Sequence, residues 1–136
     1  PVEEGEDAYG AAEALRRYLA SGAPPERVTI SSDAGGCLPC FDADGRVCSM
    51  DVGSAGALLA SMRELLRAGM ALETLLPAFT SNPARLLRLS DKGRIAAGAD
   101  ADLVALDATG GADTVIIRGA VHVRGGKAVR RGTFES

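Results

Sequence analysis

The chain has 136 residues, of which 46% are hydrophobic and 24% are charged, a composition typical of one globular domain and not of a disordered segment. Its 15 basic and 18 acidic residues are interspersed, and the net charge of −3 argues against binding to nucleic acid or to an anionic membrane surface. No apolar run reaches the roughly 20 residues that a membrane-spanning helix needs.

The N-terminus and the cysteines indicate the compartment. Residues 1–7 are acidic and lack the basic and apolar regions of a signal peptide. The three cysteines are an odd number and lie close together, which is not the pattern of a secreted disulfide framework. We therefore expect a cytoplasmic protein, and the absence of an initiator methionine fits a chain cut from something longer.

The first part of the chain is predicted to contain a helix, a strand and a glycine-rich loop. Alanine and leucine residues recur at helical spacing over 7–20, and a glycine followed by two prolines ends this helix. Residues 27–32 are predicted to form a short strand. Residues 34–53 are predicted to be a loop with a small hairpin that turns at Asp44 and Gly45.

Three helices are predicted to follow. Residues 55–68 have one leucine-rich face and are preceded by Ser54, which can cap the helix. A second helix is predicted over 71–79, and a third begins with Asn82 as its cap and Pro83 at its first position. The leucine-rich faces are expected to be core or to pack against the rest of a barrel.

The character of the sequence changes after residue 92, where glycines separate short runs rich in β-branched residues. These runs predict a small antiparallel sheet with strands at 103–106, 115–117, 121–123 and 127–129 and a hairpin turn at Gly125 and Gly126. One strand between helices cannot form a sheet by itself, so the earlier residues are predicted to be the end of a repeating βα architecture.

Asp33 stands where the predicted strand meets a glycine-rich turn that contains Gly35 and Gly36. In α/β folds, sites are built at the carboxyl ends of strands, and glycines let a ligand approach the main chain. We therefore predict that Asp33 is a catalytic residue. The alternative is that it only caps a turn, as aspartate often does.

Cys37 and Cys40 form a C-x-x-C pattern, and Cys48 follows in the same loop. Three interpretations stay open: a redox dithiol, a structural zinc site completed by His122, and reduced cysteines packed as small hydrophobic residues. A turn-like sequence follows the pattern where a redox motif needs a helix, which favours the third interpretation.

Two further pairs of acidic residues are predicted to have structural roles. Asp42 and Asp44 resemble the start of a calcium loop, but no further ligands follow at the required spacing, so a turn is expected. Asp100 and Asp102 are expected to hold backbone donors in a turn and at the entry to a strand.

Three spaced motifs resemble the C-terminal part of the amidohydrolase superfamily. They read TSNPARLL over 80–87, KGRI over 92–95 and GADADLV over 98–104. Members of this superfamily are (β/α)8 barrels with a small β-sandwich. The resemblance implies an α/β fold, in which residues 1–90 are the last βα units of a metal-dependent TIM barrel and residues 91–136 are the C-terminal strands of the β-sandwich.

Within the superfamily, other residues are most similar to the metallo-type β-aspartyl (isoaspartyl) dipeptidases. They are ISSD at 30–33, Pro39, Phe41 and Asp42, and, near the end of the chain, Lys127 and GTFE at 132–135.

This resemblance implies a mechanism. Two zinc ions are bridged by a hydroxide and a carboxylated lysine, and Asp33 would end the eighth barrel strand, ligate one zinc ion and carry a proton from the attacking hydroxide to the leaving amine. Cys37 would take a loop position where relatives usually have a serine that contacts the α-carboxylate of the substrate, with Gly36 beside it in the substrate site. A thiol is a weaker donor than a hydroxyl, which affects the choice of substrate.

The remaining zinc ligands do not occur in this sequence, and His122 matches none of them, so a polypeptide of only these residues is expected to be inactive by itself. The resemblance implies that the full-length parent is a zinc-dependent hydrolase that cleaves β-aspartyl dipeptides. Its partners would be a small dipeptide and further copies of itself, in a homo-oligomer that requires the rest of the barrel.

Two alternative functions stay open. One is a different amidohydrolase, either a dihydroorotase- or hydantoinase-like cyclic amidase or an N-acetyl sugar deacetylase. The other is a non-catalytic domain, such as a scaffold or binding module, that lacks the metal site.

Overall fold

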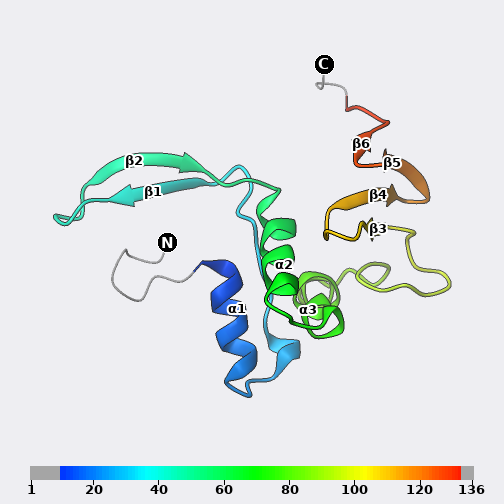
Figure 1. Ribbon diagram of the computed structural model, residues 1–136, viewed down its shortest axis with the longest axis horizontal. Coiled ribbons are helices and arrows are strands. Elements are labelled where there is room, and N and C mark those ends of the chain that lie inside the picture. Colours follow the sequence, from blue (N-terminus) through cyan, green and yellow to red (C-terminus); the bar gives the residue numbers. More distant parts are fainter. Residues whose placement is uncertain (1–9, 133–136) are drawn as a thin grey trace. The chain divides into compact units, whose positions relative to one another are not determined.

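The computed structural model describes residues 10–132. In this range the chain forms two compact units, of which the first ends at Met70 and the second begins at Ala71 (Figure 1). No helix within these residues is both long and apolar enough to cross a membrane. The boundary predicted after residue 90, between a barrel part and a sandwich part, stays a prediction.

The helices α1 (Ala11–Ala20) and α2 (Ala57–Arg67) of the first unit lie side by side (Figure 1). Each helix buries two apolar side chains that are three residues apart and therefore on one face. These side chains are Ala12 and Leu15 from α1 and Met62 and Leu65 from α2. Both predicted helices are thus confirmed in the described chain, while residues 7–9 lie outside it.

The predicted cap of α2 is wrong by two residues. Gly56 takes the cap position, and the Ser54 hydroxyl accepts a hydrogen bond from the Gly56 amide at 3.3 Å. The Ala57 amide donates to the Ser54 carbonyl at 3.0 Å. Ser54 therefore closes a turn that precedes the helix instead of capping the helix itself.

The loop predicted over 34–53 contains the expected hairpin. Strand β1 (Cys37–Phe41) pairs antiparallel with strand β2 (Val47–Val52), with an irregularity in the register next to Cys40. The Asp42 carboxylate accepts hydrogen bonds from the amides of Asp44 at 3.0 Å and Arg46 at 2.8 Å. Asp42 thus stabilises the turn that the sequence predicts at this place.

The prediction of a strand over 27–32 is wrong for the described chain. A short 3-10 helix, η1, occupies Pro25–Arg27, and Val28 is extended, with φ −109° and ψ 139°. No strand is formed from there to Asp33, because the described residues offer no neighbouring strand that could pair with this segment. Extended backbone becomes a strand only when a partner satisfies its amides and carbonyls.

The second unit begins with helices α3 (Leu72–Phe79) and α4 (Ser81–Leu86), which pack on each other. Leu75 and Ala78 of α3 are buried. Helix α4 begins one residue before the predicted cap, because Thr80 (φ −130°) interrupts α3 and the chain turns directly into the next helix. Asn82 is therefore a buried helical residue and not a cap.

The leucine-rich face continues past the end of α4 but is not covered there. Leu86 is 70% exposed, Leu87 65% and Leu89 44%. These leucines are therefore not part of the core of the described chain.

The rest of the second unit is the predicted antiparallel sheet (Figure 1). Its strands follow one another in the order β3-β4-β5-β6. Gly125 and Gly126 form the last hairpin turn, both with positive φ, which glycine adopts without steric cost. The strands are β3 (Leu103–Leu106), β4 (Ala112–Ile117), β5 (Ala120–Arg124) and β6 (Lys127–Ala128).

A charged clasp of Lys92, Asp100 and Asp102 joins the loop before β3 to the turn between β4 and β5. The Lys92 ammonium donates to Asp100 Oδ2 at 2.8 Å and also to Asp102 Oδ2. Asp102 Oδ1 accepts a hydrogen bond from the Arg118 amide at 2.7 Å. The prediction that these aspartates hold backbone donors is confirmed for Asp102. The Asp100 carboxylate instead accepts from the side chain of Lys92.

Candidate active site

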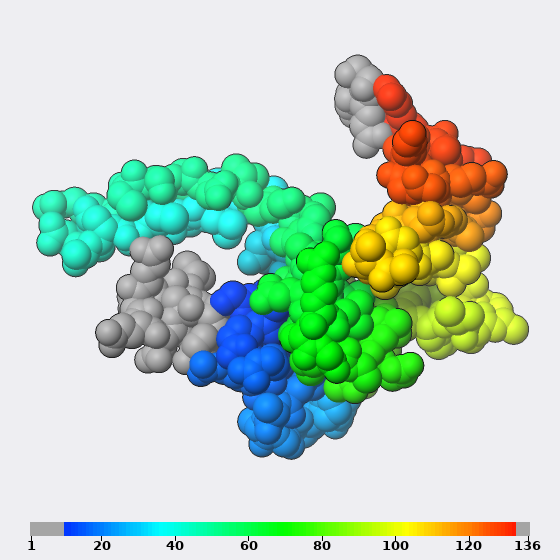
Figure 2. All heavy atoms as spheres, in the orientation of Figure 1, coloured from blue at the N-terminus to red at the C-terminus, as the bar shows by residue number. Residues whose placement is uncertain are grey.

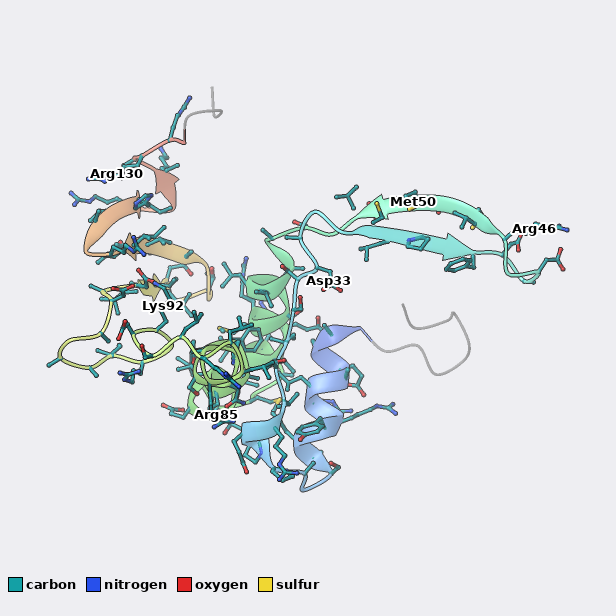
Figure 3. All side chains as sticks on the ribbon, turned by 180° about the vertical axis from the view of Figure 1, so that it is seen from behind. Asp33, Arg46, Met50, Arg85, Lys92 and Arg130 are labelled. Atoms are coloured by element: carbon teal, nitrogen blue, oxygen red, sulfur yellow. The ribbon has the colours of Figure 1, made fainter. Side chains whose placement is uncertain are left out.

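Asp33 ends the extended segment that follows η1, and its carboxylate is exposed (Figure 3). The Ser31 hydroxyl donates to Asp33 Oδ1 at 2.8 Å, and the Asp33 amide donates back to the same hydroxyl at 3.2 Å. Asp33 has φ +47°, in the left-handed region that aspartate tolerates better than most residues. The local sequence thus holds the carboxylate in one orientation at a point where the chain changes direction.

Three backbone hydrogen bonds close the turn that follows Asp33. The Gly36 amide donates to the Asp33 carbonyl at 2.8 Å. The Gly35 amide donates to the Gly53 carbonyl at 2.9 Å, and the Gly53 amide donates to the Gly36 carbonyl at 3.0 Å. The base of the hairpin is therefore tied to the turn that carries Asp33.

A shallow hollow of about 370 Å³ brings the predicted site residues together. It is lined by Asp33, Ala34, Gly36, Cys37, Leu38 and Pro39. Asp33, Gly36 and Cys37 thus line one surface. A larger hollow of about 440 Å³ beside α4 contains none of these residues.

The hairpin separates Cys37 from Cys40. Cys37 pairs with Val52 and Cys40 with Ser49. Because alternate residues of a strand point to opposite faces, two cysteines three positions apart lie on opposite faces of β1. This arrangement contradicts the redox interpretation, since Cys37 also lies in a strand and not at the start of a helix.

The surroundings of the three cysteines bear on the two other interpretations, a structural zinc site and packed, reduced cysteines. All three are free and exposed, and the Cys48 thiol donates to the Cys40 carbonyl at 3.4 Å. Within residues 10–132, no group of three His, Cys, Asp or Glu side chains could hold a metal ion. The three cysteines form no disulfide in the structure, and they lie on an exposed hairpin (Figure 2), so the prediction that they pack as small hydrophobic residues is wrong.

Asp33 fits the role of a single metal ligand. Among the described residues, Ser31 is its one side-chain partner, and it bonds to Oδ1, which leaves Oδ2 available to a ligand. One carboxylate cannot hold a metal ion by itself, and no further ligand set lies within the described residues. Any two-metal site at Asp33 therefore requires residues outside this part of the chain.

Gly53 is not among the site residues predicted from the sequence. A Cβ atom built on Gly53 would lie 2.0 Å from the carbonyl oxygen of Asp33. A glycine directly after the β-rich run 47–52 was the available signal, but such a glycine also commonly ends a strand.

Comparison with known proteins gives a family and a set of similar structures. The model of a family described as the amidohydrolase family matches residues 10–127. A solved β-aspartyl dipeptidase from the thermophilic, keratin-degrading Fervidobacterium islandicum AW-1, in complex with a β-Asp-Leu dipeptide, is 34% identical with a TM-score of 0.83. The similarity covers 98% of this chain and 34% of that one.

Two further solved structures are also similar. A second structure of β-aspartyl dipeptidase from the same organism is 30% identical, with a TM-score of 0.75, over 98% of this chain and 32% of that one. N-acetylglucosamine-6-phosphate deacetylase from Thermotoga maritima is 21% identical, with a TM-score of 0.62, over 83% of this chain and 35% of that one, a similarity of fold alone. The chain therefore spans about a third of the length of these structures.

Proposed function

The chain belongs to the amidohydrolase family, and from this premise we propose that its full-length protein is a zinc-dependent hydrolase of β-aspartyl (isoaspartyl) dipeptides. Its α/β fold is that of the C-terminal portion of a (β/α)8 barrel together with part of a small β domain. The observation that carries the proposal is the Asp33 carboxylate, held by Ser31 at a hollow shared with Gly36 and Cys37. The similarity to a dipeptidase seen with β-Asp-Leu supports the substrate.

Asp33 performs the proton transfers in this proposal. Its carboxylate accepts a proton from the attacking water and later donates that proton to the leaving amine, so one group acts first as base and then as acid. Ser31 holds Oδ1 through both steps, which leaves Oδ2 for the proton transfers. Asp33 would also ligate zinc, and zinc when bound lowers the pKa of its water.

Cys37 and Gly36 act on the substrate. Cys37 lines the hollow, and its thiol would contact the α-carboxylate of the dipeptide. Gly36 leaves room for the substrate, and its own amide is already bonded to the Asp33 carbonyl. The three exposed, free thiols support a reducing compartment such as the cytoplasm, and a homo-oligomer stays a prediction.

The test is hydrolysis of β-Asp-Leu by the longest natural form of the protein, with and without added Zn²⁺. We expect zinc-dependent release of leucine, and a fall in kcat of about 10²–10⁴-fold in Asp33→Asn, the range that general acid–base groups contribute. Asp44→Asn, the same change at an exposed position of the hairpin turn, serves as the matched control and should keep full activity.

Two outcomes would redirect the proposal. A protein that binds metal but leaves β-Asp-Leu intact while cleaving a cyclic amide or an N-acetyl sugar would be one of the alternative amidohydrolases. A protein that binds no metal and cleaves none of these substrates would be the non-catalytic domain.

A further inference from the structure

We propose that Gly53 is a positioning residue for Asp33: it has no side chain because the Asp33 peptide occupies the space where one would lie. This inference rests on the proposed catalytic role of Asp33. Gly53 lies twenty positions further along the chain and acts only through the backbone.

The distances leave no room for a side chain at this position. A Cβ atom on Gly53 would lie 2.0 Å from the Asp33 carbonyl oxygen, 2.6 Å from the Asp33 carbonyl carbon and 3.1 Å from the Ser32 carbonyl oxygen. These atoms are backbone, so no rotation of a flexible side chain relieves the overlap. An alanine at this position has to displace the Asp33 peptide by roughly 1 Å, and a misplacement of that size can cost about 10²-fold in rate.

The requirement for glycine comes from space and not from backbone conformation. Gly53 does not have a positive φ, so alanine can adopt the φ of this position without strain. The hydrogen bonds explain why the two backbones approach so closely: Gly53 bonds to the consecutive turn residues Gly35 and Gly36, and Gly36 bonds to Asp33. These bonds hold the residue after β2, Gly53, in direct contact with the backbone of Asp33.

Neighbouring glycines provide a graded series of variants. A Cβ atom on Gly36 would lie 3.0 Å from the same Asp33 oxygen, which requires a much smaller displacement. A Cβ atom on Gly56 would meet only the Ser54 hydroxyl at 3.5 Å, an ordinary contact, and Gly56 has φ −67°. Gly56→Ala is therefore the matched control, and Gly36→Ala is the intermediate case.

The first test measures β-Asp-Leu hydrolysis by these variants in the longest natural form. We expect kcat to fall about 10²-fold in Gly53→Ala with KM changed less than about threefold, and no change in Gly56→Ala. The double variant Asp33→Asn/Gly53→Ala should be no slower than Asp33→Asn, because Gly53 affects the reaction only by keeping the Asp33 backbone, and with it the carboxylate, in place. Full kcat in Gly53→Ala, or a double variant that shows both losses multiplied, would overturn the inference.

The second test does not depend on the reaction. Amide hydrogen exchange over residues 31–37 should be faster in Gly53→Ala than in Gly56→Ala, since the Gly36 amide loses its fixed acceptor. If the unmodified protein leaves β-Asp-Leu intact, the proposed function fails, but the exchange measurement still tests whether Gly53 positions Asp33. Unchanged exchange in a folded Gly53→Ala protein would overturn the inference about Gly53. If Gly53→Ala does not fold, Gly36→Ala decides by hydrogen exchange over residues 31–37, because its Cβ atom would also meet the Asp33 carbonyl oxygen, at 3.0 Å, and exchange does not depend on substrate binding.

Discussion

Ser31 and Asp33 hold each other through two hydrogen bonds: the Ser31 hydroxyl donates to Asp33 Oδ1 at 2.8 Å and accepts from the Asp33 amide at 3.2 Å. Both bonds are local, and together they stabilise a left-handed aspartate at the end of an extended segment. The serine thus orients both the backbone and the carboxylate of the proposed proton carrier.

Ser31→Ala should slow the reaction without removing it. A hydrogen bond of this kind contributes about 1 kcal/mol, which corresponds to a kcat lower by roughly fivefold. Steady-state kinetics with β-Asp-Leu measures this change. Ser31→Thr keeps the hydroxyl and should restore most of the activity, and Ser32→Ala is the neighbouring control. Equal activity of Ser31→Ala and the unmodified protein would show that the carboxylate is held by other groups.

Cys37→Ser should strengthen binding of β-aspartyl dipeptides. A hydroxyl is a better donor than a thiol toward a carboxylate, and a gain of about 0.5–1.5 kcal/mol lowers KM by roughly two- to tenfold. Cys40→Ser makes the same change on the opposite face of β1 and should leave KM unchanged. A KM that rises in Cys37→Ser would mean that the hollow prefers a substrate without this carboxylate.

The clasp of Lys92, Asp100 and Asp102 should depend on pH at both extremes. The hydrogen bond from Lys92, followed by that from the Arg118 amide, lowers the pKa of Asp102 below its ordinary value of 3.8. Its stabilising contribution is therefore complete above about pH 3.8 and is lost as the pH falls through the lower, folded-state value. The hydrogen bonds to Asp100 and Asp102 raise the pKa of Lys92 above 10.5, so its contribution is complete below that pH and is lost as the pH rises further.

Lys92→Met tests this clasp. The pKa of Asp102, followed by the NMR shift of its carboxyl carbon, should rise toward the ordinary value, and the thermal midpoint at pH 7 should fall by about 2–4 °C. Lys127→Met removes an exposed lysine of β6 and should change neither. An Asp102 titration that is the same in Lys92→Met and in the unmodified protein would contradict the role of the clasp.

Gly93→Ala should be more destabilising than Gly98→Ala. Both glycines have positive φ, +76° and +85°, but a Cβ atom on Gly93 would lie 2.6 Å from Ala84 Cβ, whereas Gly98 has open space. Gly98→Ala should cost about 1 kcal/mol of folding free energy from backbone strain alone, and Gly93→Ala roughly 3 kcal/mol from strain and overlap together. Thermal unfolding of both variants measures the difference, and equal midpoints would show that the loop near Ala84 moves aside.

The features predicted correctly from the sequence depend on neighbouring residues. The helices, the turn at Asp44 and Gly45, and the turn at Gly125 and Gly126 follow from short patterns of apolar and turn-forming residues. The prediction that Asp33 is catalytic rests on the same kind of local signal, since its position before a glycine-rich turn is visible in the sequence itself, and it stays a prediction. The boundaries that were wrong, at Ser54 and Asn82, differ by only a few residues, because competing local hydrogen bonds decide where a helix begins.

Features that depend on distant residues could not be predicted in this way. The extended segment before Asp33 forms no strand in the described chain because a strand needs a partner, and no pattern within 27–32 says whether one is present. Cys37 and Cys40 lie on opposite faces of the hairpin because both belong to strand β1, three positions apart. A C-x-x-C pattern alone is compatible with two cysteines on one side of a helix start and with two cysteines on opposite faces of a strand.

By itself, the sequence determined the helices, the hairpin turns, the amidohydrolase motifs and the candidate aspartate, because each is encoded by residues close together in the chain. Only the tertiary structure decided that Gly53 has to be a glycine and that Asp33, Gly36 and Cys37 line one hollow. The physical reason is that steric exclusion acts between atoms that meet in space, and the backbones of Asp33 and Gly53 meet only when the hairpin closes.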